Sequence, residues 1–217
     1  MSDQTQPIRV DIVSDVVCPW CAIGYYQLAR AVQETGIDVD IHWHPFELNP
    51  HMVQEGENLR EHLAAKYGTT LEGSIKARAR LTEMGAALGF TFNYADDMRM
   101  YNTFRAHQLI DWAEEQGKAH EAKLALFAAF FTLRKNVADI DVLVEVAGQI
   151  GLDRDAARAM LDSGERAEKV REKEQFWTSR GVQGVPAMIF ERQHLVTGAQ
   201  GKGNFANILR QLKEIAA

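Results

Sequence analysis

The chain contains only two cysteines among its 217 residues, and it has no long apolar run and no block of basic residues. So few cysteines exclude a small fold held together by several disulfides. The longest apolar stretch, 124–131, is far shorter than the roughly 20 residues that a membrane-spanning helix needs. With a net charge of −6, neither a nucleic acid nor a membrane is an expected partner.

A secretory signal is also absent from the first ten residues, which lack a basic start, an apolar core and a small-residue cleavage site. We therefore expect a cytoplasmic protein. In a reducing compartment, a cysteine pair is more often catalytic or metal-binding than structural. The length suits one large domain, or one domain that carries a substantial insertion.

Apolar alternation predicts a strand over residues 8–12 and another over 39–43, with a helix from Cys18 or Pro19 to Gly36 between them. Two strands joined by one helix predict a βαβ unit with parallel strands. Helical patterns then dominate from about residue 57 to residue 181. Strands over 187–190 and 194–197 follow as a hairpin, and a helix over 204–215 ends the chain.

This order predicts an α/β protein with one mixed sheet assembled from both ends of the chain and covered by helices. The helical block would be an insertion that stands as a lid or wall beside the cysteines. Asp139 and Asp153 are expected to cap helices within it. One of its helices is expected to bury a face made of Leu124, Phe127, Phe130 and Phe131.

The most informative stretch is Cys18-Pro19-Trp20-Cys21, which stands where the first helix is predicted to begin. The nucleophilic form of cysteine is the thiolate, and the partial positive charge of a helix N-terminus stabilises it. Cys18 is therefore the better attacking sulfur and should be the exposed one, although Asp15 upstream could oppose its ionisation. Cys21, one turn further on, is expected to be less exposed and less acidic, and to resolve the mixed disulfide formed by Cys18.

A zinc site and a structural disulfide are the alternatives to a redox role for the cysteine pair. Zinc prefers four ligands, so His42 and His44 on the second predicted strand would have to complete the site. The same alternation equally suits histidines that face solvent or are partly buried. A structural disulfide across so short a loop would constrain the unfolded chain very little. The redox interpretation is preferred, and no metal is expected.

A second motif, Gly184-Val185-Pro186, immediately precedes the strand predicted over 187–190. Proline has no N–H to donate to a sheet, so it suits the start of a strand. A cis Val185-Pro186 bond would turn the chain sharply and leave the Val185 backbone free to pair with an extended substrate. An ordinary trans proline is the alternative, since only about one X–Pro bond in twenty is cis in folded proteins.

With both motifs in place, the chain resembles the DsbA-like thioredoxin superfamily, and most closely its FrnE-like branch. The resemblance rests on CPWC after the first strand, a long helical insertion and a late Gly-Val-Pro before a hairpin. It covers nearly the whole chain from Ile8 onward. Further segments that fit the branch are 46–50, Asn102-Thr103, Ala106-His107 and 197–200.

The resemblance implies an α/β, thioredoxin-like fold with a large α-helical insertion. Residues 1–55 and 165–217 would form the thioredoxin-like domain, and residues 56–164 the inserted helical domain. His107 is expected to be a structural histidine with satisfied hydrogen bonds rather than a general base.

For the site, the resemblance implies that Cys18 is the nucleophile and Cys21 the resolving thiol. It also implies that Pro186 is cis and packs against the CxxC. Trp20 either contacts substrate or packs on the insertion. The residues expected to bind substrate are Pro19, Trp20, Val185 and Pro186.

The implied activity is that of a thiol–disulfide oxidoreductase of the reductase or isomerase type. Its substrates would be disulfide-containing proteins or small-molecule thiols, and glutathione or thioredoxin would be the reducing partner. Periplasmic DsbA relatives typically carry histidine where this chain has Trp20, so a strongly oxidising role is not expected. The aromatic helical segment is compatible with both a monomer and a homodimer.

The same superfamily contains glutathione-dependent isomerases of 2-hydroxychromene-2-carboxylate and kappa-class glutathione transferases. Those enzymes generally carry serine near the position of Cys18, so the two cysteines here favour dithiol chemistry. An isomerase or transferase of that kind is the alternative function. No cofactor is expected apart from glutathione as a co-substrate.

Overall fold

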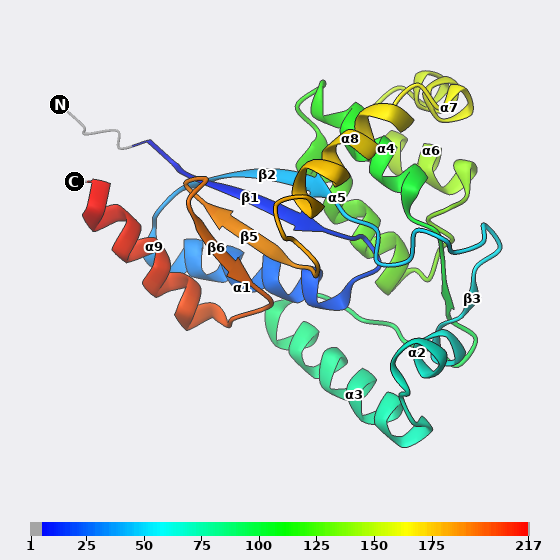
Figure 1. Cartoon of the computed structure of the whole chain (residues 1–217), viewed down its shortest axis with the longest axis horizontal. Helices are drawn as coiled ribbons and strands as arrows, with labels where there is room; N and C mark the ends of the chain where they lie inside the picture. Colours follow the sequence, from blue (N-terminus) through cyan, green and yellow to red (C-terminus); the bar gives the residue numbers. More distant parts are fainter. Residues whose placement is uncertain (1–5, 217) are drawn as a thin grey trace.

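The computed structural model describes residues 6–216 (Figure 1). Residues 1–5, which begin the predicted thioredoxin-like segment, and residue 217 lie outside the described residues. A mixed four-stranded sheet has the order β2-β1-β5-β6, so both ends of the chain contribute to it, as predicted. Its strands are β1 (Ile8–Ser14), β2 (Val39–Pro45), β5 (Ala187–Phe190) and β6 (His194–Thr197).

The predicted βαβ unit is present. Helix α1 (Pro19–Thr35) connects β1 to β2, which run parallel from the Ile8–Val39 pair to the Ser14–Pro45 pair. Gly36 ends the helix with φ 65°, a left-handed conformation that glycine adopts without a steric penalty. Because β1 is an inner strand and leads straight toward α1, residue 18 emerges at the carboxyl end of this strand.

The predicted hairpin is also present, since β5 pairs antiparallel with both β1 and β6. Strand β5 therefore lies directly beside β1, and the residues just before Ala187 come close to the end of β1. This pairing brings together two segments that are more than 160 positions apart in the sequence.

Helices cover both faces of the sheet, as Figure 1 shows, with α1 and α9 (Lys202–Ala216) together on one of them. Val10 and Ile12 of β1 belong to the main core with α1 and α9, and they have no exposed surface. On the other face, Val13 packs with Ile189 in a second cluster that Trp177 of α8 (Ala167–Thr178) covers. Alternate residues of β1 thus enter opposite layers, which explains why the strand is almost entirely buried.

The segment between β2 and α8 is mainly helical, as predicted, and Asp139 and Asp153 cap their helices through side-chain hydrogen bonds. The assignment of residues 56–164 to a separate inserted domain stays a prediction. Within residues 6–216, no helix has the length and apolar character needed to cross a membrane. The helices of this segment are α2 (Leu59–Tyr67), α3 (Leu71–Leu88), α4 (Phe104–Glu114), α5 (Ala119–Phe127), α6 (Ile140–Gln149) and α7 (Arg154–Ser163).

Two features of this segment differ from the prediction. The strands β3 (Glu57–Asn58) and β4 (Arg99–Met100) form a short antiparallel ladder, and strands of two residues are too short to show a period-2 pattern. The helix that starts at Ala119 also changes to a π-helix, η1 (Ala128–Thr132). The extra residue in a π turn lets the adjacent Phe130 and Phe131 both enter the core, with ring centroids 4.8 Å apart.

Candidate active site

Cys18 is the N-cap residue of α1, and Pro19 occupies the first helical turn, as the sequence predicts. Its backbone is extended, with φ −89° and ψ 112°, and its thiol does not cap the helix. The Sγ atom instead lies 3.6 Å from the carbonyl oxygen of Val185, the residue before Pro186. Only 3% of Cys18 is exposed, which corrects the prediction of an open sulfur, because the Val185 segment lies against it.

Cys21 lies one turn deeper and has no exposed surface. Burial raises the pKa of its thiol well above the ordinary value, and hydrogen bonding to Cys18 and the charge on Cys18 add to this effect. Cys21 is the less exposed of the two thiols, as predicted, and the direction of its pKa shift agrees with its expected role as the resolving thiol. Both cysteines are free thiols.

Lys123 of α5 supplies a positive charge behind the thiols. Its side chain is 1% exposed, and its Nζ donates to the carbonyl of Ser14 at 3.3 Å. Burial lowers the Lys123 pKa to about 8, while the charges of Cys21, Asp15 and Cys18 act in the opposite direction. The lysine charge in turn counteracts the rise in the Cys21 pKa.

Asp15 is a fully buried carboxylate whose charge interacts with that of Lys123. Burial alone would raise its pKa, but hydrogen bonding from His107 and the His107 charge lower it, as do the backbone of Leu48 and the charge of Lys123. His107 Nε2 donates to Asp15 Oδ1 at 3.2 Å and to the carbonyl of Phe46 at 3.0 Å. The interpretation of His107 as a structural histidine therefore fits its contacts.

The Val185-Pro186 peptide bond is cis, as the resemblance implies. Pro186 is buried next to α1, where a Cβ at Gly24 would come within 3.3 Å of the Pro186 ring and 3.2 Å of Met188. The Gly198 amide donates to the Pro186 carbonyl at 2.8 Å. Gly24 therefore leaves room for the proline segment beside α1, which carries both cysteines, and Gly198 holds this segment through a hydrogen bond.

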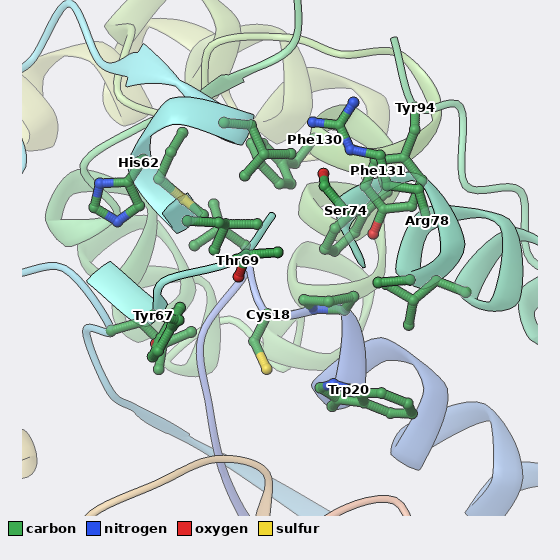
Figure 2. Close-up of a pocket in the computed structure, with 18 of the residues that line it drawn as sticks. Cys18, Trp20, His62, Tyr67, Thr69, Ser74, Arg78, Tyr94, Phe130 and Phe131 are labelled. Atoms are coloured by element: carbon green, nitrogen blue, oxygen red, sulfur yellow. The ribbon is translucent and has the colours of Figure 1, made fainter. Parts of the chain in front are cut away.

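A cavity of about 350 Å³ opens beside Cys18, and α2, α3 and η1 form much of its wall. Figure 2 shows Cys18 and Trp20 at one end of it, with Ser74 and Arg78 of α3 on the opposite side. The predicted lid or wall beside the cysteines is therefore present, and the nearly buried Cys18 faces a cavity of ligand size.

Of the residues predicted to bind substrate, all except Pro186 come together at this cavity. Pro19, Trp20 and Val185 line it, and Trp20 is exposed. Pro186 lines a separate groove along the Gly181–Gly198 side, so it adjoins the cavity through Val185 alone.

The histidines considered for zinc are occupied elsewhere. His42 pairs with Asp40 at 2.7 Å, and His44 pairs with Asp11 at 2.8 Å. Among residues 6–216, no three His, Cys, Asp or Glu side chains are grouped so that they could hold a metal ion. The contacts of these histidines do not support the zinc alternative.

Lys123 is not among the site residues that the sequence predicts, because a lysine beside an apolar run is normally a surface residue. A usable signal was present, since Lys123 shares its helix face with Phe127, four positions later. Both side chains prove to be fully buried, with Lys123 Nζ 5.2 Å from the centre of the Phe127 ring.

Replacing Lys123 by methionine is expected to slow the attack of Cys21 on a mixed disulfide roughly three- to tenfold at pH 7, because less Cys21 thiolate is then present. The lysine loses its own charge as the pH rises through about 8. The difference between the native protein and Lys123→Met should therefore be largest below pH 8 and should shrink above it.

The measurement is stopped-flow release of glutathione from the Cys18 mixed disulfide between pH 6 and pH 10. Lys76→Met is the matched control, because Lys76 is an exposed lysine of α3 that pairs with Glu72 and lies outside the site. A native-to-variant ratio that stays constant across this range would contradict an electrostatic role of Lys123.

Known proteins share this fold over nearly the whole chain. The family model for a DSBA-like thioredoxin domain matches residues 9–210. The crystal structure of the probable DsbA oxidoreductase SCO1869 from Streptomyces coelicolor is similar, with 30% sequence identity and a TM-score of 0.88, and the match covers 95% of this chain and 90% of that one.

Two more distant solved structures share the fold. A 2-hydroxychromene-2-carboxylate isomerase has 18% identity and a TM-score of 0.69, over 96% of this chain and 100% of its own. The cytosolic disulfide reductase DsbM from Pseudomonas aeruginosa, solved with GSH, has 16% identity and a TM-score of 0.65, over 95% of this chain and 99% of its own.

Proposed function

We propose that this chain, which belongs to the DSBA-like thioredoxin family and is an enzyme of that family, acts as a thiol–disulfide reductase or isomerase through its CPWC dithiol. One observation carries the proposal. Cys18 lies at the N-terminus of α1 and contacts the Val185 carbonyl before the cis proline, and it faces a cavity with Cys21 buried one turn behind it.

The chemistry follows from the different surroundings of the two thiols. The Cys18 thiolate attacks one sulfur of a substrate disulfide, forms a mixed disulfide and expels the other substrate sulfur as a thiolate. Cys21 gives up its proton and attacks the Cys18 sulfur, which releases the rest of the substrate as a second thiol. The substrate gains two electrons, and the Cys18–Cys21 disulfide that remains needs a reductant.

Glutathione or thioredoxin is the proposed reductant, and disulfide-bearing proteins or small molecules are the proposed substrates. A structural neighbour solved with GSH and described as a cytosolic disulfide reductase supports glutathione as partner and a cytoplasmic location. In a reducing compartment, net reduction or isomerisation is favoured over net oxidation. Membership of the FrnE-like branch of the family is part of the same proposal.

A redox titration of the Cys18–Cys21 couple against glutathione buffers tests the proposal. We expect one two-electron transition with a midpoint more negative than the roughly −120 mV of a strong oxidant, because the CPWC loop carries no histidine. The two thiols are counted by alkylation and mass spectrometry at each buffer ratio. If glutathione adducts form at every ratio and a Cys18–Cys21 disulfide at none, the dithiol mechanism is wrong.

A second candidate, a glutathione-dependent isomerase or transferase for a small aromatic molecule, is favoured by the apolar cavity beside Cys18. Unlike the dithiol mechanism, this reaction requires glutathione in every turnover and does not require Cys21. The response to replacing Cys21 therefore separates the two candidates.

A further inference from the structure

We propose that the cavity beside Cys18 binds a small molecule with an apolar body and a carboxylate, and that Arg78 and Ser74 hold the carboxylate. This inference rests on the proposed function, because it names the class of disulfide that Cys18 would meet there. The substrate would be a low-molecular-weight disulfide with an aromatic or similarly apolar acid on at least one side.

The guanidinium of Arg78 has N–H groups without a hydrogen-bond acceptor in the cavity wall. Its side chain is 12% exposed and lies in the cavity wall, but Nη1 alone has a hydrogen-bond partner, the carbonyl of Ala95 at 3.2 Å. Nε and Nη2 are buried, and neither has a hydrogen-bond partner within residues 6–216, although the guanidinium carbon lies 5.6 Å from the centre of the Tyr94 ring. Buried guanidinium groups are normally paired, and a carboxylate is the acceptor whose two oxygens match adjacent guanidinium N–H groups.

Ser74 places a buried hydroxyl beside Arg78. It stands one helical turn before Arg78 on α3, so the two side chains share a face. Ser74 is only 3% exposed, and its hydroxyl likewise has no partner within the described chain. Figure 2 shows the Ser74 hydroxyl and the Arg78 guanidinium directed to the same part of the cavity. A hydroxyl beside a guanidinium adds one more donor for a carboxylate oxygen.

The charges around Arg78 also favour an anion. Its nearest acidic group, Asp96, lies 3.9 Å from Nη1, and the Asp96 side chain is exposed and already paired with Arg60. Two guanidinium groups thus share one carboxylate, which leaves a net positive charge at this end of the cavity. The pKa of Arg78 is lowered by burial and then by Arg60, the pattern of a cation without enough counter-charge.

The rest of the cavity is suited to an apolar body. Its volume of about 350 Å³ is at the small end of ordinary ligand sites. The wall between the Arg78 end and Cys18 is largely apolar, so a ring placed there would lie between the anchored carboxylate and the sulfur. The apolar residues of this wall include Leu59, Leu63, Leu81, Met100, Phe130 and Phe131.

The reaction needs no component beyond the proposed dithiol. Cys18 thiolate attacks the disulfide sulfur nearest to it, one aromatic thiolate leaves, and the other half stays bonded to Cys18. Cys21 then closes the protein disulfide and releases the second thiol. The two electrons come from the reduced protein.

The test compares two disulfides in single-turnover reduction by the pre-reduced protein. The carboxylated probe is 5,5′-dithiobis(2-nitrobenzoate), and the probe without a carboxylate is 4,4′-dithiodipyridine. Arg78→Met keeps an apolar stem and removes the charge, and we expect it to lower the rate with the carboxylated probe about tenfold or more. The rate with the pyridine probe should change less than about twofold. Arg78→Lys should recover part of the loss, because it restores the charge without the planar fork.

Arg80→Met is the matched control, because Arg80 is an exposed arginine of the same helix and is not part of the cavity wall. Ser74→Ala is expected to lower only the rate with the carboxylated probe, by a few-fold. Equal losses on both probes, or equal losses in Arg78→Met and Arg80→Met, would overturn the carboxylate site while leaving the dithiol chemistry intact. A native protein that reduces neither probe would instead reject the proposed function.

A binding measurement without the nucleophile tests whether Arg78 holds the carboxylate independently of the redox reaction. Calorimetric titration of the Cys18→Ser variant with 2-naphthoate should show one site that Arg78→Met weakens about tenfold. Uncharged 2-naphthamide should bind equally with and without Arg78. Equal binding of 2-naphthoate by both proteins would count against Arg78 as the anchor.

Discussion

Replacing Cys18 by serine is expected to abolish disulfide reduction, with a loss of at least about a thousandfold in turnover. A serine hydroxyl stays protonated at neutral pH and does not attack a disulfide sulfur, whereas the remaining thiol, Cys21, has no exposed surface. Burial also raises the pKa of Cys21, so the buried thiol cannot substitute for the missing one. The assay is glutathione-coupled reduction of insulin, and of the aromatic disulfides, by the full chain.

The loss in Cys18→Ser has to be separated from misfolding. The exchange of one sulfur for oxygen at an N-cap leaves the helix start intact, since the Cys18 thiol makes no capping hydrogen bond in the native protein. Thermal unfolding of the variant should therefore stay within a few degrees of the native protein. Turnover near the native level in a folded Cys18→Ser protein would remove Cys18 from the mechanism.

The fold could be predicted where its signals are local. Strand β1 alternates, α1 begins at a proline and ends at a glycine, and β5 and β6 are short neighbouring segments that form a hairpin. The β3–β4 ladder could not be predicted, because two-residue strands carry no period and their pairing joins positions about 40 residues apart. The π turn could not be predicted either, because the apolar residues at the start of that helix follow an ordinary 3.6-residue spacing.

The same distinction between local and long-range signals applies to the residues of the candidate site. The two cysteines and Pro186 are visible because their motifs are contiguous in the sequence. Lys123 and Arg78 are not, since each lies more than 50 positions after the CPWC motif and is brought to the site by its helix. A charged residue on a predicted helix is normally a surface residue, and only tertiary packing reveals that these two are largely buried.

These two cations have distinct positions relative to Cys18. Lys123 lies behind the thiols, where its charge affects the ionisation of Cys21. Arg78 lies in the cavity wall, where its charge is available to a ligand. Changes at Lys123 should therefore alter the resolving step for every substrate, whereas changes at Arg78 should alter the first attack and only for anionic substrates.

Replacing Cys21 by serine is expected to stop the reaction at the mixed disulfide. The native Cys21 is one helical turn from Cys18 and attacks within the same molecule, where effective concentrations reach about 10⁵ M or more in well-oriented systems. In the variant, only external glutathione at millimolar concentration can release the bound half of the substrate. Turnover with insulin should fall at least about a hundredfold, and the remaining rate should rise linearly with glutathione concentration.

Mass spectrometry of the Cys21→Ser protein quenched with acid should show one substrate half bonded to Cys18, and added dithiothreitol should remove it. The double variant Cys18→Ser, Cys21→Ser is the matched control and should carry no adduct. A glutathione-dependent isomerase predicts the opposite behaviour, since Cys21 takes no part in that reaction and the single variant would keep its turnover. Because the two candidate functions share the fold, Cys18 and the cavity, the fate of the Cys21→Ser protein distinguishes them where structural similarity does not.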